Sequence, residues 1–129
     1  MNRYLAYCLK LTTNLCWCLR KGFSPVMILT CDVPFKTVPA STRFPHPLSI
    51  VIGTRVVLGE GCIVRQNVTI GTKRWVNGSA GPQPQIGNGV DIGAGAIILG
   101  DVSVGDNAVI GAGAFVDKPV PANTIYISH

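Results

Sequence analysis

His46 is the side chain in this sequence best suited to moving a proton. It stands in the segment Pro45-His46-Pro47, and an imidazole that titrates near neutral pH can take the proton of an attacking hydroxyl group. The plainer interpretation is that His46 only begins the first unit of the repeat described below. The other histidine, His129, is the last residue and is expected to be mobile and inert. A general base at position 46 is therefore the first hypothesis.

The cysteines form no metal or disulfide pattern. None of the five belongs to a C-x-x-C pair, and two histidines cannot complete a zinc set. We therefore expect no metal site and no disulfide framework, and a reducing cytoplasm fits this cysteine usage. The five are Cys8, Cys16, Cys18, Cys31 and Cys62.

The composition is that of one small, well-packed domain. Of the 129 residues, 47% are hydrophobic and 13% charged, which excludes disorder as the main state. The net charge of +5 suits an anionic ligand, but the basic residues are scattered without interleaved aromatics, so no nucleic-acid partner is expected. Lys10 and the polar segment 12–14 interrupt the apolar run from Tyr4 to Leu19. The run therefore predicts neither a membrane span nor a signal peptide.

A repeat of six residues governs the chain beyond residue 50. Glycine follows the anchor residue in seven of ten units, and a small or medium apolar residue stands four positions after the anchor in nine. A lone strand has period two and a helix period 3.6, so a period of six indicates a short strand followed by a corner. Such units stack as the coils of a β-helix, with the anchors filling its interior. The anchors are Ile52, Leu58, Val64, Ile70, Ile86, Ile92, Ile98, Val104, Ile110 and Val116.

Two segments depart from this repeat. Sixteen positions separate the anchors Ile70 and Ile86 where six would suffice, so residues 72–85 are predicted to leave the coil as a structureless loop suited to binding. Residues 1–31 precede the coil, which we place at 32–129. In this first segment a stripe at helical spacing predicts a helix that caps the coil end or packs on a neighbouring subunit rather than on a membrane. The stripe is Tyr4, Tyr7, Leu11, Leu15 and Cys18.

The sequence resembles the hexapeptide-repeat acyltransferases, whose fold is a left-handed parallel β-helix. The resemblance covers roughly 32–125 and is carried by four segments. It is most similar to serine acetyltransferases and the O-acetyltransferases of surface-polysaccharide pathways. The segments are His46-Pro47-Leu48-Ser49-Ile50-Val51-Ile52-Gly53, Asn67-Val68-Thr69-Ile70-Gly71, Ile92-Gly93-Ala94-Gly95-Ala96-Ile97-Ile98-Leu99-Gly100, and Ile110-Gly111-Ala112-Gly113-Ala114 running on to Lys118-Pro119-Val120-Pro121.

The resemblance implies roles for particular residues. His46 stands where these enzymes carry their catalytic histidine. Asp32, fourteen residues earlier, resembles the aspartate that orients that histidine; its plainer interpretation is a turn or cap residue. Gln83 replaces the family's second histidine, and an amide can hold a substrate group but cannot exchange its proton. Together with Arg74 and Trp75 it is expected to bind the acceptor.

The resemblance also implies acetyl-CoA as cosubstrate and a homotrimer. Pantetheine is expected along the turns at Ala94, Gly95 and Ala112, with Lys118 near a nucleotide phosphate. The plainer interpretation of each is an ordinary coil corner. The sequence lacks the Gly-x-Pro-Ala-basic tail that many relatives carry near the cofactor.

The function expected is O-acetylation of a sugar or surface-polysaccharide precursor. Only about forty-five residues precede His46, whereas serine acetyltransferases carry a long helical domain there, and Gln83 also departs from their pattern. Serine O-acetylation and a catalytically impaired structural trimer stay open as alternatives. A hydratase like the γ-type carbonic anhydrases is excluded, because its metal site needs three histidines from the coil.

Overall fold

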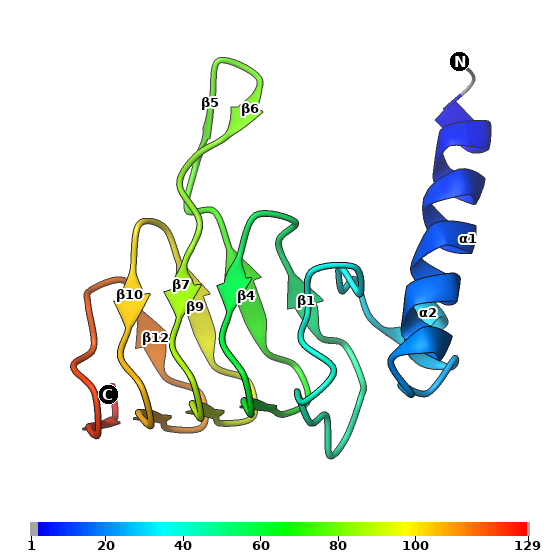
Figure 1. Ribbon diagram of the computed structural model, residues 1–129. Helices are drawn as coiled ribbons and strands as arrows, with labels where there is room; N and C mark the ends of the chain where they lie inside the picture. Colours follow the sequence, from blue (N-terminus) through cyan, green and yellow to red (C-terminus); the bar gives the residue numbers. More distant parts are fainter. Residues whose placement is uncertain (1–2, 129) are drawn as a thin grey trace.

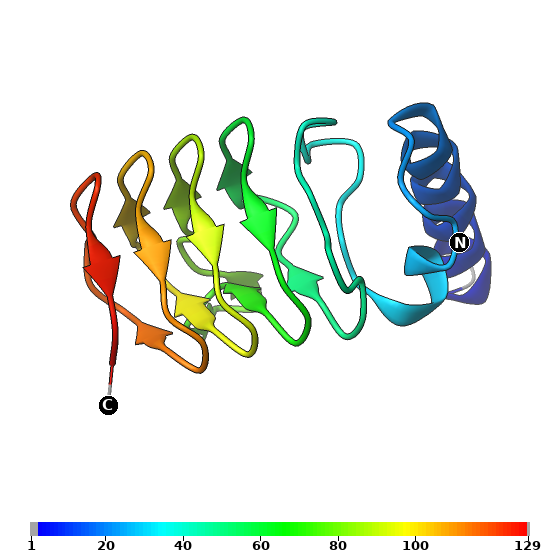
Figure 2. The same cartoon turned by 90° about the horizontal axis from the view of Figure 1, so that it is seen from below.

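The computed structural model describes residues 3–128, so His129 lies outside the described residues. Figure 1 shows a row of stacked coils with helix α1 (Arg3–Arg20) standing beyond the first coil. Figure 2 views the same row from below, with the carboxyl-terminal coil at the far end from α1. A short helix, α2 (Met27–Thr30), joins α1 to the coils.

The coils have three sides because neighbouring strands of one sheet are separated by three repeat units. Val51 pairs in parallel with Thr69, and Val109 with Asp91, each eighteen residues apart. Thr69 pairs with Ile97, and the insertion adds ten residues to the eighteen-residue spacing there. This confirms the predicted length of the insertion.

Three parallel sheets result. The first sheet runs in the order β1 (Val51–Ile52), β4 (Thr69–Gly71), β9 (Ile97–Leu99), β12 (Phe115–Val116). The second sheet runs β10 (Ser103–Val104), β7 (Gln85–Ile86), β2 (Val57–Leu58). The third sheet runs β13 (Ile125–Tyr126), β11 (Val109–Ile110), β8 (Asp91–Ile92), β3 (Ile63–Val64).

The core is the column of side chains that the repeat predicts. All ten anchors are buried, and so are the nine apolar residues four positions after them. Ile98, for example, is fully buried and lies in register between Ile70 and Val116 of the coils on either side. The residue before each anchor faces outward, as Ile97 does. The predicted inward register is confirmed.

The expectation of a structureless loop at 72–85 is wrong. The segment contains an antiparallel hairpin of β5 (Trp75–Val76) and β6 (Ser79–Ala80) that projects from the row of coils (Figure 1). Asn77 and Gly78 form its turn with φ angles of 49° and 76°. Asn-Gly is the preferred pair for such a turn because both residues tolerate positive φ.

The apolar stripe of α1 packs on the coil only in part. Cys18 is buried and Leu11 half-buried, but Tyr4, Tyr7 and Leu15 are exposed. Cys18 and Leu11 thus contact the coil end as predicted, and the contact of the exposed residues with a neighbouring subunit stays a prediction. The covered residues lie toward the end of the helix that connects to the coil, just before Gly22, whose φ of 76° ends the helix.

Candidate active site

His46 lies on the irregular segment that leads into the first regular strand, β1. Its side chain is exposed, and within residues 3–128 it has no hydrogen bond or ion pair. Thr30 holds this segment through two hydrogen bonds. Its hydroxyl donates to the carbonyl of Pro47 at 3.0 Å, and its backbone carbonyl accepts from the amide of Ser49 at 2.9 Å. The imidazole is thus exposed on a segment whose backbone is held after His46 by Thr30 and before it by the pairing of Arg43 with Ile63.

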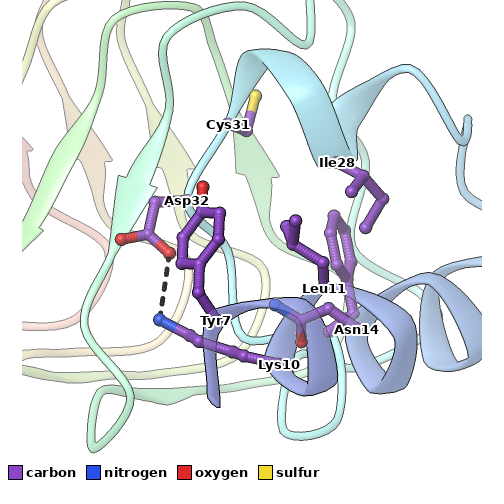
Figure 3. A pocket seen from close by; sticks show the side chains of 8 residues that line it. Tyr7, Lys10, Leu11, Asn14, Ile28, Cys31 and Asp32 are labelled. Carbon is purple, nitrogen blue, oxygen red and sulfur yellow. Dashed lines mark ion pairs between the residues drawn. The ribbon is translucent and has the colours of Figure 1, made fainter. Parts of the chain in front are cut away.

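Asp32 does not contact His46. Its backbone pairs with Val51 at the edge of the first sheet, donating to Ile50 and accepting from Ile52. Being in register with the outward-facing Val51, its carboxylate also faces outward, where it lies 3.8 Å from the Lys10 amine of α1 (Figure 3). The expected orientation of His46 by Asp32 is therefore not formed within the chain.

A groove of about 430 Å³ lies on the outer face of the first sheet. Its floor is formed by β1 and β4, one side by the hairpin and the other by Lys10. Asp32, Trp75 and Gln83 all line it, so the structure brings these three predicted site residues together. His46 is not among its lining residues.

Gln83 is positioned by the backbone around it. Its side-chain oxygen accepts from the amide of Arg55 at 3.0 Å, and it packs directly over Gly53, where any Cβ would collide with the amide group. The guanidinium of Arg55 in turn donates to the carbonyls of Ala80 and Gly81. Arg55, which the sequence did not single out, therefore fastens the base of the hairpin beside Gln83.

Arg74 lies outside this groove. It lines a separate hollow of about 250 Å³ with Lys73, Gly100 and Asp101. Lys73 pairs with Asp117 at 3.1 Å, which ties the start of the insertion to a later coil. The structure thus separates Arg74 from Gln83 and Trp75, with which it was grouped.

Ala94, Gly95 and Ala112 occupy one corner of the coil, between the third and first sheets. The amide of Gly95 donates to the carbonyl of Gln66 at 3.0 Å, and that of Gly113 to the carbonyl of Ala94 at 2.8 Å. These corners carry no side chain longer than a methyl group at Ala94, Gly95 and Ala112, so another molecule can approach the backbone closely. Three of the predicted cofactor residues are therefore neighbours.

Gln66 is a residue of this corner that the sequence did not reveal. Its side-chain oxygen is covered and has no hydrogen-bond donor within residues 3–128. A covered acceptor without a donor costs free energy. No periodic pattern marks such a group, because its cost depends on what the neighbouring coil supplies.

Lys118 lies at a different corner from Ala112. It follows β12, so one whole side of the coil separates the two residues. Ala112 and Lys118 are six residues apart in the chain, and six residues of extended chain span at most about 20 Å. A ligand that contacts both residues must cross the outer face of β12, where Phe115 is exposed.

The buried thiols do not offer a nucleophile. Burial raises the pKa of Cys62, whose sulfur donates to the carbonyl of Gly87 at 3.2 Å, and burial also raises the pKa of Cys18. Both are held as neutral thiols, which react poorly. Within residues 3–128 no three His, Cys, Asp or Glu side chains come together as metal ligands.

Comparison with known proteins places the repeat in a family. Residues 83–118 match the family model "Bacterial transferase hexapeptide (six repeats)". The chain is 42% identical over 108 residues to an Escherichia coli K12 protein named "Putative colanic acid biosynthesis acetyltransferase WcaB", covering 80% of this chain and 65% of that protein. The chain spans between 31% and 65% of the length of the first curated relatives it matches.

Solved structures show the same architecture. Soybean serine acetyltransferase, as the apoenzyme, is 26% identical with a TM-score of 0.64, covering 95% of this chain and 55% of that one. A serine acetyltransferase in complex with CoA is 38% identical with a TM-score of 0.57, covering 64% of this chain and 33% of that one. The expectation of a left-handed parallel β-helix is confirmed.

Proposed function

We propose, from the match of residues 83–118 to the bacterial transferase hexapeptide family and the similarity to an acetyltransferase, that this chain is an acetyl-CoA-dependent O-acetyltransferase. The observation that carries the proposal is the exposed, unpaired imidazole of His46 on a fixed segment of the coil. It is supported by the similarity to an acetyltransferase over most of the chain.

His46 is the general base of the proposed reaction. Its imidazole takes the proton of the acceptor hydroxyl as that oxygen forms a bond to the acetyl carbonyl carbon, and it returns the proton to the departing sulfur. The acetyl–sulfur bond breaks, and CoA and the acetyl ester are the products. An imidazole changes protonation near neutral pH and can serve in both directions.

The corner at Ala94, Gly95 and Ala112 fits the pantetheine chain of acetyl-CoA. Its backbone is open to close approach, because Ala94, Gly95 and Ala112 carry no side chain longer than a methyl group. A phosphate group at Lys118 would require the cosubstrate to cross the exposed face of β12. The proposal of acetyl-CoA is supported by the similar serine acetyltransferase that was solved in complex with CoA.

The groove at Gln83 and Trp75 is the proposed acceptor site. Trp75 is largely exposed at the groove's edge, and a flat indole beside an amide and a carboxylate is a surface on which a sugar ring can stack and hydrogen-bond. This favours a sugar or polysaccharide-precursor hydroxyl. Asp32, with Lys10, is placed to bind that acceptor rather than to orient His46 of the same chain.

A homotrimer would complete this site. His46 does not line the groove of its own chain, so we propose that His46 of one subunit faces the groove of the next. The exposed apolar residues Val51, Ile97 and Phe115 on the first sheet would be covered by such an assembly. All five cysteines are free, which suits a cytoplasmic enzyme.

L-Serine is the second candidate acceptor. The structural neighbours include serine acetyltransferases, one of them in complex with serine. Serine is a small zwitterion, and the Lys10–Asp32 pair at one side of the groove offers a group of each sign to it. A structural trimer without activity is the remaining alternative.

The test is mass-spectrometric detection of CoA released from acetyl-CoA, with L-serine and a panel of sugars and nucleotide sugars as acceptors. Release with a sugar and not with serine would support the proposal. Release with serine alone would make this a short serine acetyltransferase. No release with any acceptor, together with no binding of acetyl-CoA by calorimetry, would favour the inactive trimer.

A further inference from the structure

The outer side of α1 carries an apolar stripe that no residue among 3–128 covers. Leu5, Leu9 and Leu19 are 55%, 50% and 55% exposed, and Cys16 between them is also exposed. At 100° per residue these four lie on the side of the helix away from the buried Cys18. A solvated helix normally carries polar side chains on that side, so the stripe needs a partner.

The charge around this stripe has one sign. Residues 1–31 contain four cations and no Asp or Glu, so they carry +4 of the chain's net charge of +5. Within residues 3–128, Arg3 and Arg20 form no ion pair, and Arg20 lies 5.2 Å from the centre of the Trp17 ring. A partner for this surface is therefore expected to be anionic as well as apolar.

Tyr4 and Tyr7 are 82% and 62% exposed, but at 100° per residue they lie on the Cys18 side of α1 and are not part of the stripe. No helix within residues 3–128 is long and apolar enough to cross a membrane, so any contact with a bilayer would lie along its surface.

We propose that α1 docks flat on a membrane surface that contains anionic lipids. Leu5, Leu9 and Leu19 enter the boundary of the acyl chains, while Arg3 and Arg20 meet the headgroup phosphates. A second copy of the chain fits less well, because two such helices would bring two segments of charge +4 together. The inference rests on α1 alone and does not depend on the acceptor of the reaction.

The experiment is flotation of the full chain with vesicles of phosphatidylcholine alone or with 30 mol% phosphatidylglycerol, on the order of 0.1 M salt. We expect binding to the anionic vesicles and little to the neutral ones. The double variant Arg3→Gln/Arg20→Gln should weaken binding about tenfold or more, since each cation near an anionic surface contributes substantially. Leu5→Ser/Leu9→Ser should abolish the binding that survives in 0.5 M salt, roughly where charge attraction is screened.

Matched controls separate α1 from general charge and apolarity. Arg43→Gln/Lys118→Gln removes two cations from the coils, and Val57→Ser/Ile125→Ser removes two exposed apolar residues from the coil walls. Both controls should float like the unaltered chain. Circular dichroism and melting should show that all four variants fold, because none of the changed side chains is buried.

Three outcomes would overturn the proposal. The chain could fail to float with anionic vesicles, or the controls could lose as much binding as the α1 variants. The chain could also stay unbound while Leu5→Ser/Leu9→Ser reduces its oligomeric mass in light scattering, which would make the stripe a contact between copies. Selective loss in the α1 variants alone would establish the docking surface.

Discussion

Adding one methyl group at Gly93 should separate two coils of the solenoid. An ideal Cβ there would lie 2.5 Å from the backbone nitrogen of Ala112 and 2.7 Å from the carbonyl oxygen of Ile110. These are backbone atoms of the next coil, and that same carbonyl accepts the Gly93 amide at 2.8 Å. The φ of Gly93 is not in the left-handed region, so the effect comes from space rather than from backbone strain.

The cost follows from the contacts that must open. The next coil has to move away by roughly 1 Å to reach ordinary contact distance, which weakens two inter-coil hydrogen bonds of about 1 kcal/mol each. With overpacking strain of about 1 kcal/mol, Gly93→Ala should lower the free energy of unfolding by about 3 kcal/mol. For a domain of this size that corresponds to a melting temperature lower by roughly 10 °C.

Gly71→Ala is the matched control. It makes the same chemical change two corners earlier, at the end of β4, where no atom lies within 4 Å of the added Cβ. Its melting temperature, measured by circular dichroism, should stay within about 4 °C of the parent chain. If the two variants melted together, the close stacking of the Gly93 and Ala112 corners would be wrong.

Three further predictions concern the site and the core. Thr30→Val removes the hydroxyl that holds Pro47 and should lower kcat about tenfold with the KM for acetyl-CoA unchanged. The control Thr37→Val should leave kcat unchanged. Equal kcat values for the two variants would exclude a positioning role for Thr30. Ile98→Asp places a charge in the buried column and should abolish the folded circular-dichroism signal, while Ile97→Asp, directed outward, should keep it; a folded Ile98→Asp chain would contradict the register. Burial raises the pKa of Cys62, so the unfolded chain releases the thiol proton at a lower pH than the folded chain does. The free energy of unfolding should therefore fall as pH rises above about 8.5. The urea midpoint of Cys62→Ala should fall less steeply with pH than that of the parent chain, and equal slopes would refute the assignment.

The coil could be predicted because its pattern is local and repeated. Each unit of six residues places one anchor inward, so the sequence alone determines which side chains form the column. The turn of the hairpin was equally local: Asn77-Gly78 is a strong hairpin signal between two short extended runs. Its neighbours Gly81 and Pro82 suggested an irregular loop, but Arg55 binds the carbonyls of Ala80 and Gly81 and closes the hairpin at its base.

The contacts of the site could not be predicted because they join distant segments. Asp32 faces Lys10 because α1 packs beside the first coil, a geometry that no spacing in the sequence encodes. The first coil is also irregular: Arg43 pairs with Ile63 at a separation of twenty residues rather than eighteen. That extra length, in a segment rich in proline, leaves His46 on the surface although its position in the repeat would direct it inward.

The central claim is that His46 moves the proton in acetyl transfer. The most direct measurement compares CoA release by the parent chain and by His46→Asn with the acceptor found in the panel. The account predicts a loss of turnover of about 100-fold or more, with the melting temperature and the affinity for acetyl-CoA unchanged, since the imidazole is exposed and forms no hydrogen bond or ion pair within residues 3–128. Turnover retained in His46→Asn, at unchanged acetyl-CoA affinity, would contradict it.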